Sequence, residues 1–342
     1  MPKKRRKIRV ALIFGGKSNE RKVSLNSAKS IAENLDSNKY DVIPVEISKA
    51  GKFLLDTKTV KQIGEKVDTK KITGRELIPF EKSAEGKIDV ALLALHGPGG
   101  EDGTIQGMLE LLGIPYTDSG VLASSLAMDK ARAKRLVTSA GVPVLPHIVI
   151  SKKDFKRKGK KLLREIKGKV AVKPNRLGSS IGVTISGNKQ EIAAGIVKAL
   201  KYGSEVIIEP FVEGREITVP VLGNDEPRVL PIVEIVPRGK SKFYDYAAKY
   251  AEGGSEHIIP APLSLARQKA VKEFALVAHK VLGCRGATRV DFIMDKKGDF
   301  YFLEINTIPG MTATSLVPQA AAAAGINYSK LLDILIGLAF EK

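Results

Sequence analysis

Two segments near the C-terminus, Ala287-Thr-Arg-Val-Asp-Phe-Ile-Met-Asp295 and Phe300-Tyr-Phe-Leu-Glu-Ile-Asn306, decide how this sequence is interpreted. Both alternate with a period of two, which is typical of β-strands that are buried on one face. The residues between them, Lys296-Lys-Gly-Asp299, are typical of a tight turn. The two segments are therefore predicted to form an antiparallel hairpin.

The turn predicts a register for the hairpin in which Asp295 faces Phe300. One side is then wholly apolar and consists of three facing pairs, Met294–Tyr301, Phe292–Leu303 and Val290–Ile305. The other side carries two polar pairs, Asp291–Glu304 and Arg289–Asn306, because alternate side chains share a face.

The polar side of the hairpin predicts a cation site. Two carboxylates that face each other repel unless a positive charge lies between them. Asp291, Glu304 and Asn306 carry the hard oxygen ligands that Mg²⁺ prefers. The alternative is a solvated hairpin face on which water separates the charges.

Bulk composition is that of a globular protein with two or three domains. The chain has 342 residues, of which 43% are hydrophobic and 27% charged. No apolar run reaches the length of a membrane span, and the first residues lack the apolar core of a signal peptide. A single cysteine, Cys284, excludes an internal disulfide framework. These features predict a cytoplasmic protein with no membrane partner.

The formal net charge of +19 is concentrated in part at the N-terminus, where residues 1–10 carry six basic side chains. A basic excess is compatible with nucleic-acid contact or with attraction of anionic substrates. The segment Pro2-Lys-Lys-Arg-Arg-Lys7 also resembles a nuclear localisation signal. No nucleic-acid-binding motif accompanies it, so we interpret residues 1–7 as a solvated basic tail and expect no nucleic-acid partner.

The N-terminal region, 1–125, is predicted to be a doubly wound α/β domain. The apolar run Ile8–Phe14 is typical of a buried parallel strand, and a helix at about 24–35 and strands near 42–47 and 88–95 follow it. Polar loops at 15–20 and 96–103 follow two of these strands. Ligand sites in such sheets lie at the carboxyl ends of the strands, so both loops should open toward one crevice.

Two further domains are expected, at 126–212 and 213–342. Their predicted helices cover approximately residues 127–139, 189–201, 264–282 and 328–340.

Four loops carry polar groups suited to ligand binding. Lys173-Pro-Asn-Arg-Leu-Gly-Ser-Ser-Ile-Gly182 offers backbone N–H groups, hydroxyls and a lysine to a phosphate, although a glycine-serine loop without a ligand is equally common. Glu209 and Glu216 stand at the ends of a segment that could grip a nucleoside or be an acidic linker. The segment 243–254 suits a lid that excludes water, and 307–315 continues from the hairpin beside the predicted cation site.

Taken together and in this order, the motifs resemble the D-alanine–D-alanine ligases of the ATP-grasp superfamily. The resemblance runs from about residue 8 to 340. The segments that carry it include Gly15-Gly-Lys-Ser-Asn-Glu20, His96-Gly, Gly100-Glu-Asp-Gly-Thr-Ile-Gln-Gly107, Met128-Asp-Lys130, Lys173-Pro, Gly178-Ser-Ser-Ile-Gly182, Tyr244-Asp-Tyr246, Ala248-Lys-Tyr250, Arg289-Val-Asp-Phe292 and Glu304-Ile-Asn-Thr-Ile-Pro-Gly-Met-Thr312. It implies a three-domain α/β (α+β ATP-grasp) fold, a homodimer, and ATP-dependent joining of two D-alanines through an acyl phosphate for peptidoglycan precursor synthesis.

The resemblance also implies roles for individual residues. ATP would be bound by Lys130, Lys173 and Ser180 at its phosphates, Glu209 at the adenine amino group, Phe211, Val212 and Leu303 around the base, Glu216 at the ribose, and Lys249 at the transferred phosphate. Two Mg²⁺ ions, with Mn²⁺ as an alternative, would be held by Asp291, Glu304 and Asn306. The first D-alanine would meet Glu20, connected with Ser179 and Tyr250, and would place its carboxylate near His96. Ser315 and Leu316 would receive the second D-alanine, while Arg289 and the N–H of Gly310 would stabilise the oxyanion.

One departure from the family pattern is Pro210, where many relatives carry lysine. Its ring nitrogen cannot donate a hydrogen bond, so adenine contact is expected to depend more on Glu209 and the Phe211–Val212 backbone. Two alternatives stay open: an ATP-grasp ligase for another carboxylate and amine pair, such as D-alanine with D-serine or D-lactate, and a nucleic-acid-binding protein on a degenerate ligase scaffold.

Overall fold

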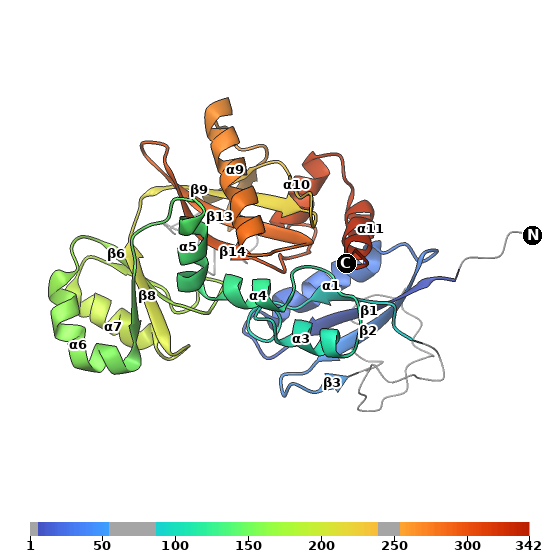
Figure 1. Cartoon of the computed structure of the whole chain (residues 1–342), viewed down its shortest axis with the longest axis horizontal. Helices are drawn as coiled ribbons and strands as arrows, with labels where there is room; N and C mark the ends of the chain where they lie inside the picture. Colours follow the sequence, from blue (N-terminus) through green and yellow to red (C-terminus); the bar gives the residue numbers. More distant parts are fainter. Residues whose placement is uncertain (1–5, 55–86, 239–253, 342) are drawn as a thin grey trace, which may run out of the picture.

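Three β-sheets organise the chain in the computed structural model, which describes residues 6–54, 87–238 and 254–341 (Figure 1). The N-terminal sheet has the order β3-β2-β1-β4. Its strands are β1 (Ile8–Gly15), β2 (Tyr40–Ile47), β3 (Phe53–Leu54) and β4 (Val90–Ala94). β1 pairs in parallel with both β2 and β4, as expected for a doubly wound unit.

Helices cover both faces of the N-terminal sheet. Val10, Leu12 and Phe14 of β1 pack in a core with helix α1 (Arg21–Asn34), whereas Ala11 and Ile13 pack in a second core with α3 (Thr104–Leu111). Both sets of alternate side chains are buried, which explains the continuous apolar run of this strand.

The central sheet is antiparallel and has the order β5-β8-β6-β7. Its elements are β5 (Ile148–Ser151), α6 (Lys152–Glu165), β6 (Val170–Pro174), β7 (Thr184–Ser186), α7 (Lys189–Ala199) and β8 (Glu205–Pro210). The two helices pack on this sheet at one end of the molecule (Figure 1).

The C-terminal sheet is the largest, with β12-β11-β9-β13-β14 in order and β10 paired to β9. Its strands are β9 (Gly214–Leu222), β10 (Arg228–Val229), β11 (Val233–Pro237), β12 (Ser255–Ile258), β13 (Ala287–Asp295) and β14 (Phe300–Asn306). Helix α9 (Leu265–Val281) packs on it, and α10 (Leu316–Ala323) and α11 (Tyr328–Ala339) follow β14.

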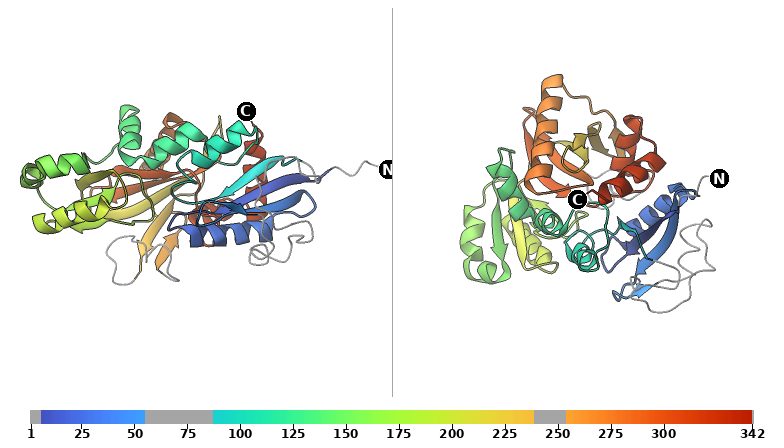
Figure 2. Two further views of the ribbon diagram at one scale, coloured as in Figure 1. Left: turned by 90° about the horizontal axis from the view of Figure 1, so that it is seen from below. Right: turned by 45° about the vertical axis from the view of Figure 1, so that its right-hand side comes forward.

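Packing ties these parts of the chain together. Helices α10 and α11 share a core with β1 and α1, so the C-terminal end of the chain covers one face of the N-terminal sheet (Figure 2). Helices α4 (Val121–Met128) and α5 (Lys130–Ser139) contribute to the core of the C-terminal sheet. The domain boundaries after residues 125 and 212 stay predictions.

A break at Asp129 corrects one prediction. The helix expected at about 127–139 begins at Lys130, and α4 precedes it as a separate helix. Asp129 caps α5 because its carboxylate accepts a 3.0 Å hydrogen bond from the backbone N–H of Arg132.

The hairpin of β13 and β14 is confirmed at its functional end. Asp291 faces Glu304 and Arg289 faces Asn306. The register predicted toward the turn is wrong, because a β-bulge after Asp291 shifts the pairing by one residue. The observed pairs beyond it are Phe292–Phe302, Ile293–Tyr301 and Met294–Phe300.

The bulge has a consequence for the predicted apolar side of the hairpin. Phe302, not Leu303, joins the core, where its ring lies 6.1 Å from that of Phe292. Leu303 instead lines a cavity together with Glu304. The bulge therefore gives β14 two adjacent residues that serve the same site.

Within the described ranges, no single helix is long and apolar enough to cross a membrane. Helices α10 and α11 reach that length and apolar composition only when they are taken as a pair, and they are bent by 107° relative to each other.

Candidate active site

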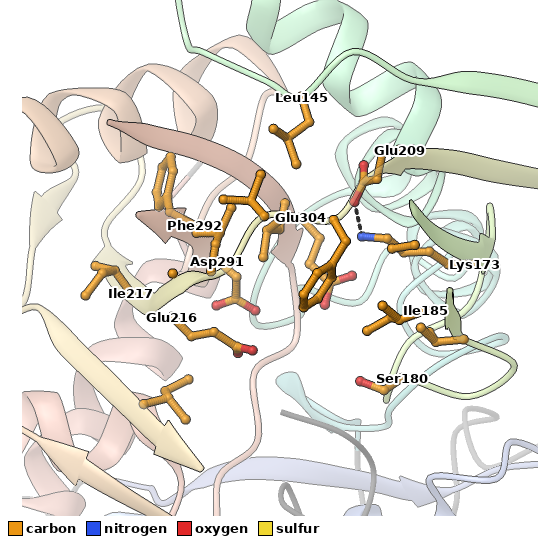
Figure 3. A pocket seen from close by; sticks show the side chains of 18 of the residues that line it. Leu145, Lys173, Ser180, Ile185, Glu209, Glu216, Ile217, Asp291, Phe292 and Glu304 are labelled. Carbon is orange, nitrogen blue, oxygen red and sulfur yellow. Dashed lines mark ion pairs between the residues drawn. The ribbon is translucent and has the colours of Figure 1, made fainter. Parts of the chain in front are cut away.

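A cavity of about 980 Å³ lies between the central and C-terminal sheets (Figure 3). Its size is at the upper end of the range for small-molecule sites, about 300–1,000 Å³. Ten residues predicted from the sequence line it: Lys130, Lys173, Ser180, Glu209, Phe211, Val212, Glu216, Asp291, Leu303 and Glu304. The structure thus brings together residues that are up to 174 positions apart, from Lys130 to Glu304.

The inner end of the cavity contains a nearly buried carboxylate, Glu209, on β8. Lys173, across the β6–β8 pair, forms an ion pair with its Oε1 (Figure 3). Lys134 on α5 lies 3.1 Å from Oε2. Burial alone would raise the pKa of Glu209, but the two lysines outweigh it and bring the pKa down to about 2. Glu209 is therefore an anionic hydrogen-bond acceptor at neutral pH.

The segment after Glu209 differs from its predicted use in one detail. The backbone N–H of Phe211 donates a 2.9 Å hydrogen bond to the carbonyl of Lys169, and the Lys169 ammonium lies 4.5 Å from the Phe211 ring centroid. That N–H is therefore engaged within the protein. Phe211 contributes its ring to the cavity wall, and the Val212 backbone stays the predicted contact for a base.

The polar side of the hairpin forms the opposite part of the cavity (Figure 3). Arg289 donates to both carboxylate oxygens of Asp291, from Nε to Oδ1 at 2.9 Å and from Nη2 to Oδ2 at 2.8 Å. Asn306 Nδ2 donates to Asp291 Oδ2 at 3.1 Å, which leaves the amide oxygen as the end that can act as a ligand. Lys130 Nζ lies 3.0 Å from Glu304 Oε2.

The donor set of this hairpin fits a hard divalent cation. It offers the oxygens of two opposed carboxylates and an amide, as Mg²⁺ prefers. In the described part of the chain, no group of three or more His, Cys, Asp or Glu residues is placed so that it could hold a metal ion.

The glycine loop after β6 is held in a strained conformation. Ser179 and Ser180 have φ angles of 53° and 56°, in the left-handed region that residues with a side chain seldom adopt. Such backbone strain is typical of functional sites. Lys130 Nζ donates to the carbonyl of Leu177 at 2.8 Å, so the same lysine joins this loop to Glu304.

The loop also reaches the N-terminal sheet. The hydroxyl of Ser179 donates to Oε1 of Glu20, and both side chains are buried. Gly97 lies against the same glutamate: its φ is +74°, and a Cβ at this position would be 2.5 Å from Glu20 Oε2. The glycine loop after β6 and the loops at 15–20 and 96–103 therefore meet at one carboxylate.

His96 ties three segments together beside Glu20. Its Nδ1 lies 3.1 Å from the carbonyl of Ile308, which can only accept, so Nδ1 carries the hydrogen. Its Nε2 then accepts from the Ser27 hydroxyl at 3.2 Å. Burial lowers the pKa of His96 and keeps it neutral. Since both ring nitrogens are bonded within the protein, the predicted contact with a substrate carboxylate stays a prediction.

The loop at 307–315 ends at the N-terminus of α10. Ser315 is the N-cap residue, and its Oγ accepts a 3.0 Å hydrogen bond from the Thr312 N–H. A helix N-terminus attracts carboxylates through its free N–H groups, which suits the expected roles of Ser315 and Leu316. Gly310 lies close to Ser315, because a Cβ on it would be 2.9 Å from Ser315 Oγ.

Lys249 and Tyr250 lie outside the described residues. Two further groups, the buried Lys134 and the half-buried Glu101, were given no individual role by the motifs. Burial and the charge of Glu20 raise the pKa of Glu101 to about 8, so this carboxyl keeps its proton at neutral pH.

Comparison with known proteins gives one family over almost the whole chain. A family model described as "D-ala D-ala ligase N-terminus" matches residues 9–119, and one described as "D-ala D-ala ligase C-terminus" matches residues 136–337. The chain belongs to the D-alanine–D-alanine ligase family. The ATP-grasp fold expected from the motifs is confirmed by its structural neighbours.

Individual members of the D-alanine–D-alanine ligase family are similar over their full lengths. A D-alanine–D-alanine ligase of Syntrophobacter fumaroxidans is 44% identical, with 98% of each chain covered. One from Pelotomaculum thermopropionicum is 40% identical, covering 98% of this chain and 97% of the relative. The crystal structure of the VanG D-Ala:D-Ser ligase from Enterococcus faecalis superposes with a TM-score of 0.83 at 36% identity, covering 98% and 100% of the two chains. That of a Bacillus anthracis D-alanine–D-alanine ligase complexed with ATP gives 0.74 at 32%, covering 97% of each.

Proposed function

We propose that this chain joins two D-alanine molecules into D-alanyl-D-alanine, consumes ATP, and releases ADP and phosphate for peptidoglycan precursor synthesis in the cytoplasm. One observation carries the proposal beyond family membership. The strained loop that lines the cavity is bonded through Ser179 to Glu20, which precedes helix α1 of the N-terminal region. A phosphate held by that loop would lie beside an amino acid held by Glu20.

In the first step, the carboxylate of one D-alanine attacks the γ-phosphate of ATP, giving an acyl phosphate and ADP. The nucleophile and the phosphate are both anionic, so the reaction needs cations around the transferred group. Lys173, Ser180 and Lys130 supply charge and donors there. Glu20 binds the ammonium of this D-alanine and so orients its carboxylate.

Asp291, Glu304 and Asn306 would hold Mg²⁺, for which we propose two ions, with Mn²⁺ as an alternative. The bound ions supply neutralisation of phosphate charge. In this structure the Arg289 guanidinium donates to the Asp291 carboxylate and so neutralises its charge.

In the second step, the amine of another D-alanine attacks the acyl carbon, and the tetrahedral intermediate expels phosphate. The N-terminus of α10, at Ser315 and Leu316, receives the carboxylate of this substrate. Arg289 and the Gly310 N–H stabilise the oxyanion, for which a single donor typically contributes about 2.7–4 kcal/mol. We propose that Lys249 and Tyr250 of segment 243–254 complete the site and help to exclude water from the acyl phosphate.

The test is phosphate release from ATP and Mg²⁺ across a panel of D- and L-amino acids and D-lactate, with products identified by mass. A reaction with D-alanine as its sole amino acid should release phosphate and yield the dipeptide, and no other acid of the panel should do so by itself. If D-alanine fails while another acid supports release, the substrate assignment is wrong. A mixed product with D-serine or D-lactate in preference to D-alanine would favour the alternative ligase.

Two coarser features of the protein are also proposed. The domains divide after residues 125 and 212, and the chain forms a homodimer, as the family resemblance implies. Light scattering of the purified protein tests the second point, since a monomer mass across micromolar concentrations would contradict it.

A further inference from the structure

Lys134 is a fully buried lysine outside the cavity. It lies one helical turn after Lys130 on α5, so the two side chains project from the same face. Lys130 reaches Glu304 at the metal end of the site, whereas Lys134 reaches Glu209 at the inner end. Its side chain is 0% exposed and its residue does not line the cavity, so it cannot touch a bound nucleotide itself.

The ammonium of Lys134 is anchored on both sides. It donates a 2.9 Å hydrogen bond to the carbonyl of Phe302 on β14 and lies 3.1 Å from Oε2 of Glu209 on β8. A lysine held this way spans the central and C-terminal sheets, which form the two walls of the cavity. Burying such a charge is costly, and burial lowers the pKa of Lys134 while Glu209 acts in the opposite sense.

The two oxygens of Glu209 differ in how they are used. Oε1 is paired with Lys173, which lines the cavity and is a predicted phosphate ligand. Oε2 is buried and accepts no hydrogen bond from the described residues, although Lys134 lies beside it. Oε2 is therefore paired by charge with Lys134 and keeps lone-pair capacity for a donor that a ligand would supply.

We propose that Lys134 is the positioning residue that keeps Glu209 charged and aligned with the nucleobase when Lys173 turns to the phosphates of ATP. The inference rests on the proposed use of ATP. A bound phosphate competes with Glu209 for Lys173, whose ammonium sits at the cavity wall. Lys134 has no such competitor, because it is enclosed by protein and tethered to Phe302.

This arrangement selects the class of base. The exocyclic amine of adenine donates to Glu209 Oε2, whereas a 6-oxopurine presents a carbonyl that faces an anionic acceptor. A site with a buried acceptor discriminates strongly against a ligand that cannot donate to it. Lys134 therefore sets nucleobase selectivity without contacting the base.

The experiment measures ATP and inosine triphosphate binding by calorimetry in wild type, Lys134→Met, Glu209→Gln and the double variant. Lys134→Met should weaken ATP binding by about tenfold and reduce the preference for ATP over inosine triphosphate by a similar factor. Arg135→Met is the matched control, because Arg135 is an exposed cation on the same helix. It should leave the preference unchanged. The KM for D-alanine should not move in any of these variants.

The double variant separates positioning from a structural role. If Lys134 acts through Glu209, the double variant has the same base preference as Glu209→Gln alone. Should Lys134→Met fail to fold, this comparison still decides, since the double variant buries no unpaired carboxylate. Full preference for ATP in folded Lys134→Met, or a further loss in the double variant, would overturn the inference. Calorimetry without amino acid keeps these outcomes independent of whether D-alanine is the substrate.

Discussion

Replacing Glu304 by glutamine should stop catalysis while leaving the fold intact. The carboxylate faces Asp291 across the hairpin and lies 3.0 Å from Lys130 Nζ. With an effective dielectric constant of about 20, the attraction to Lys130 is about 5.5 kcal/mol, and the repulsion from a carboxylate at about 5 Å is about 3.3 kcal/mol. Removing the charge loses the first term and relieves the second, which is a net loss of about 2 kcal/mol. Recovered desolvation offsets more, so the unfolding free energy should change by no more than about 2 kcal/mol.

The catalytic effect of Glu304→Gln should be far larger. A metal that neutralises phosphate charge contributes several kcal/mol to transition-state stabilisation, and a loss of about 4 kcal/mol corresponds to about a thousandfold in rate. The assay is ADP release at saturating ATP and D-alanine with Mg²⁺ titrated, together with thermal unfolding. Asp299→Asn is the matched control, because Asp299 is exposed at the turn of the same hairpin. Near-normal turnover of folded Glu304→Gln at every Mg²⁺ concentration would show that the hairpin does not hold the metal.

Three further perturbations follow from the structure. Ser179→Ala should raise the KM for D-alanine while ATP binding measured alone stays unchanged, because the lost hydroxyl holds Glu20; equal effects on both ligands would contradict that role. Glu101→Gln should flatten the pH dependence of the unfolding free energy. Burial and the charge of Glu20 raise the pKa of Glu101 in the folded protein from 4.5 to about 8, so between these pH values the folded protein binds a proton that the unfolded chain lacks. Wild-type stability therefore falls as the pH rises from about 4.5 to about 8. An unchanged slope in the variant would show that another group is responsible. Phe302→Ala should lower the unfolding free energy by about 3–5 kcal/mol in denaturant titration, since its ring is fully buried. A loss below about 1 kcal/mol would mean that the surrounding core closes over the space that the ring leaves.

The hairpin shows what periodicity can and cannot predict. Alternation gave the two strands and the facing of Asp291 and Glu304, because side-chain direction follows from strand geometry. It could not give the bulge, since one extra residue costs little locally and is favoured only by what Phe302 packs against in the assembled core. Leu303 therefore reached the cavity by a route that strict alternation excludes.

Buried partners at long range were the other gap. In the sequence, Lys134 is one of four basic residues in the ten-residue helix α5, and only the meeting of α5 with β8 and β14 encloses its charge. The break between α4 and α5 has a related cause, because the Asp129 carboxylate that caps α5 also accepts hydrogen bonds from Asn175 and Arg176 of the distant glycine loop. The four-residue spacing of Lys130 and Lys134 in the sequence predicts that they share one helix face, but not which acids they meet.

Oxygen transfer tests the central claim most directly. D-Alanine labelled with ¹⁸O in its carboxylate is incubated with the protein, ATP and Mg²⁺, and the phosphate released is examined by ³¹P NMR alongside the dipeptide. If the carboxylate of the first D-alanine attacks the γ-phosphate, each phosphate released with a dipeptide carries one labelled oxygen. Dipeptide formation with unlabelled phosphate would contradict an acyl phosphate intermediate at this site.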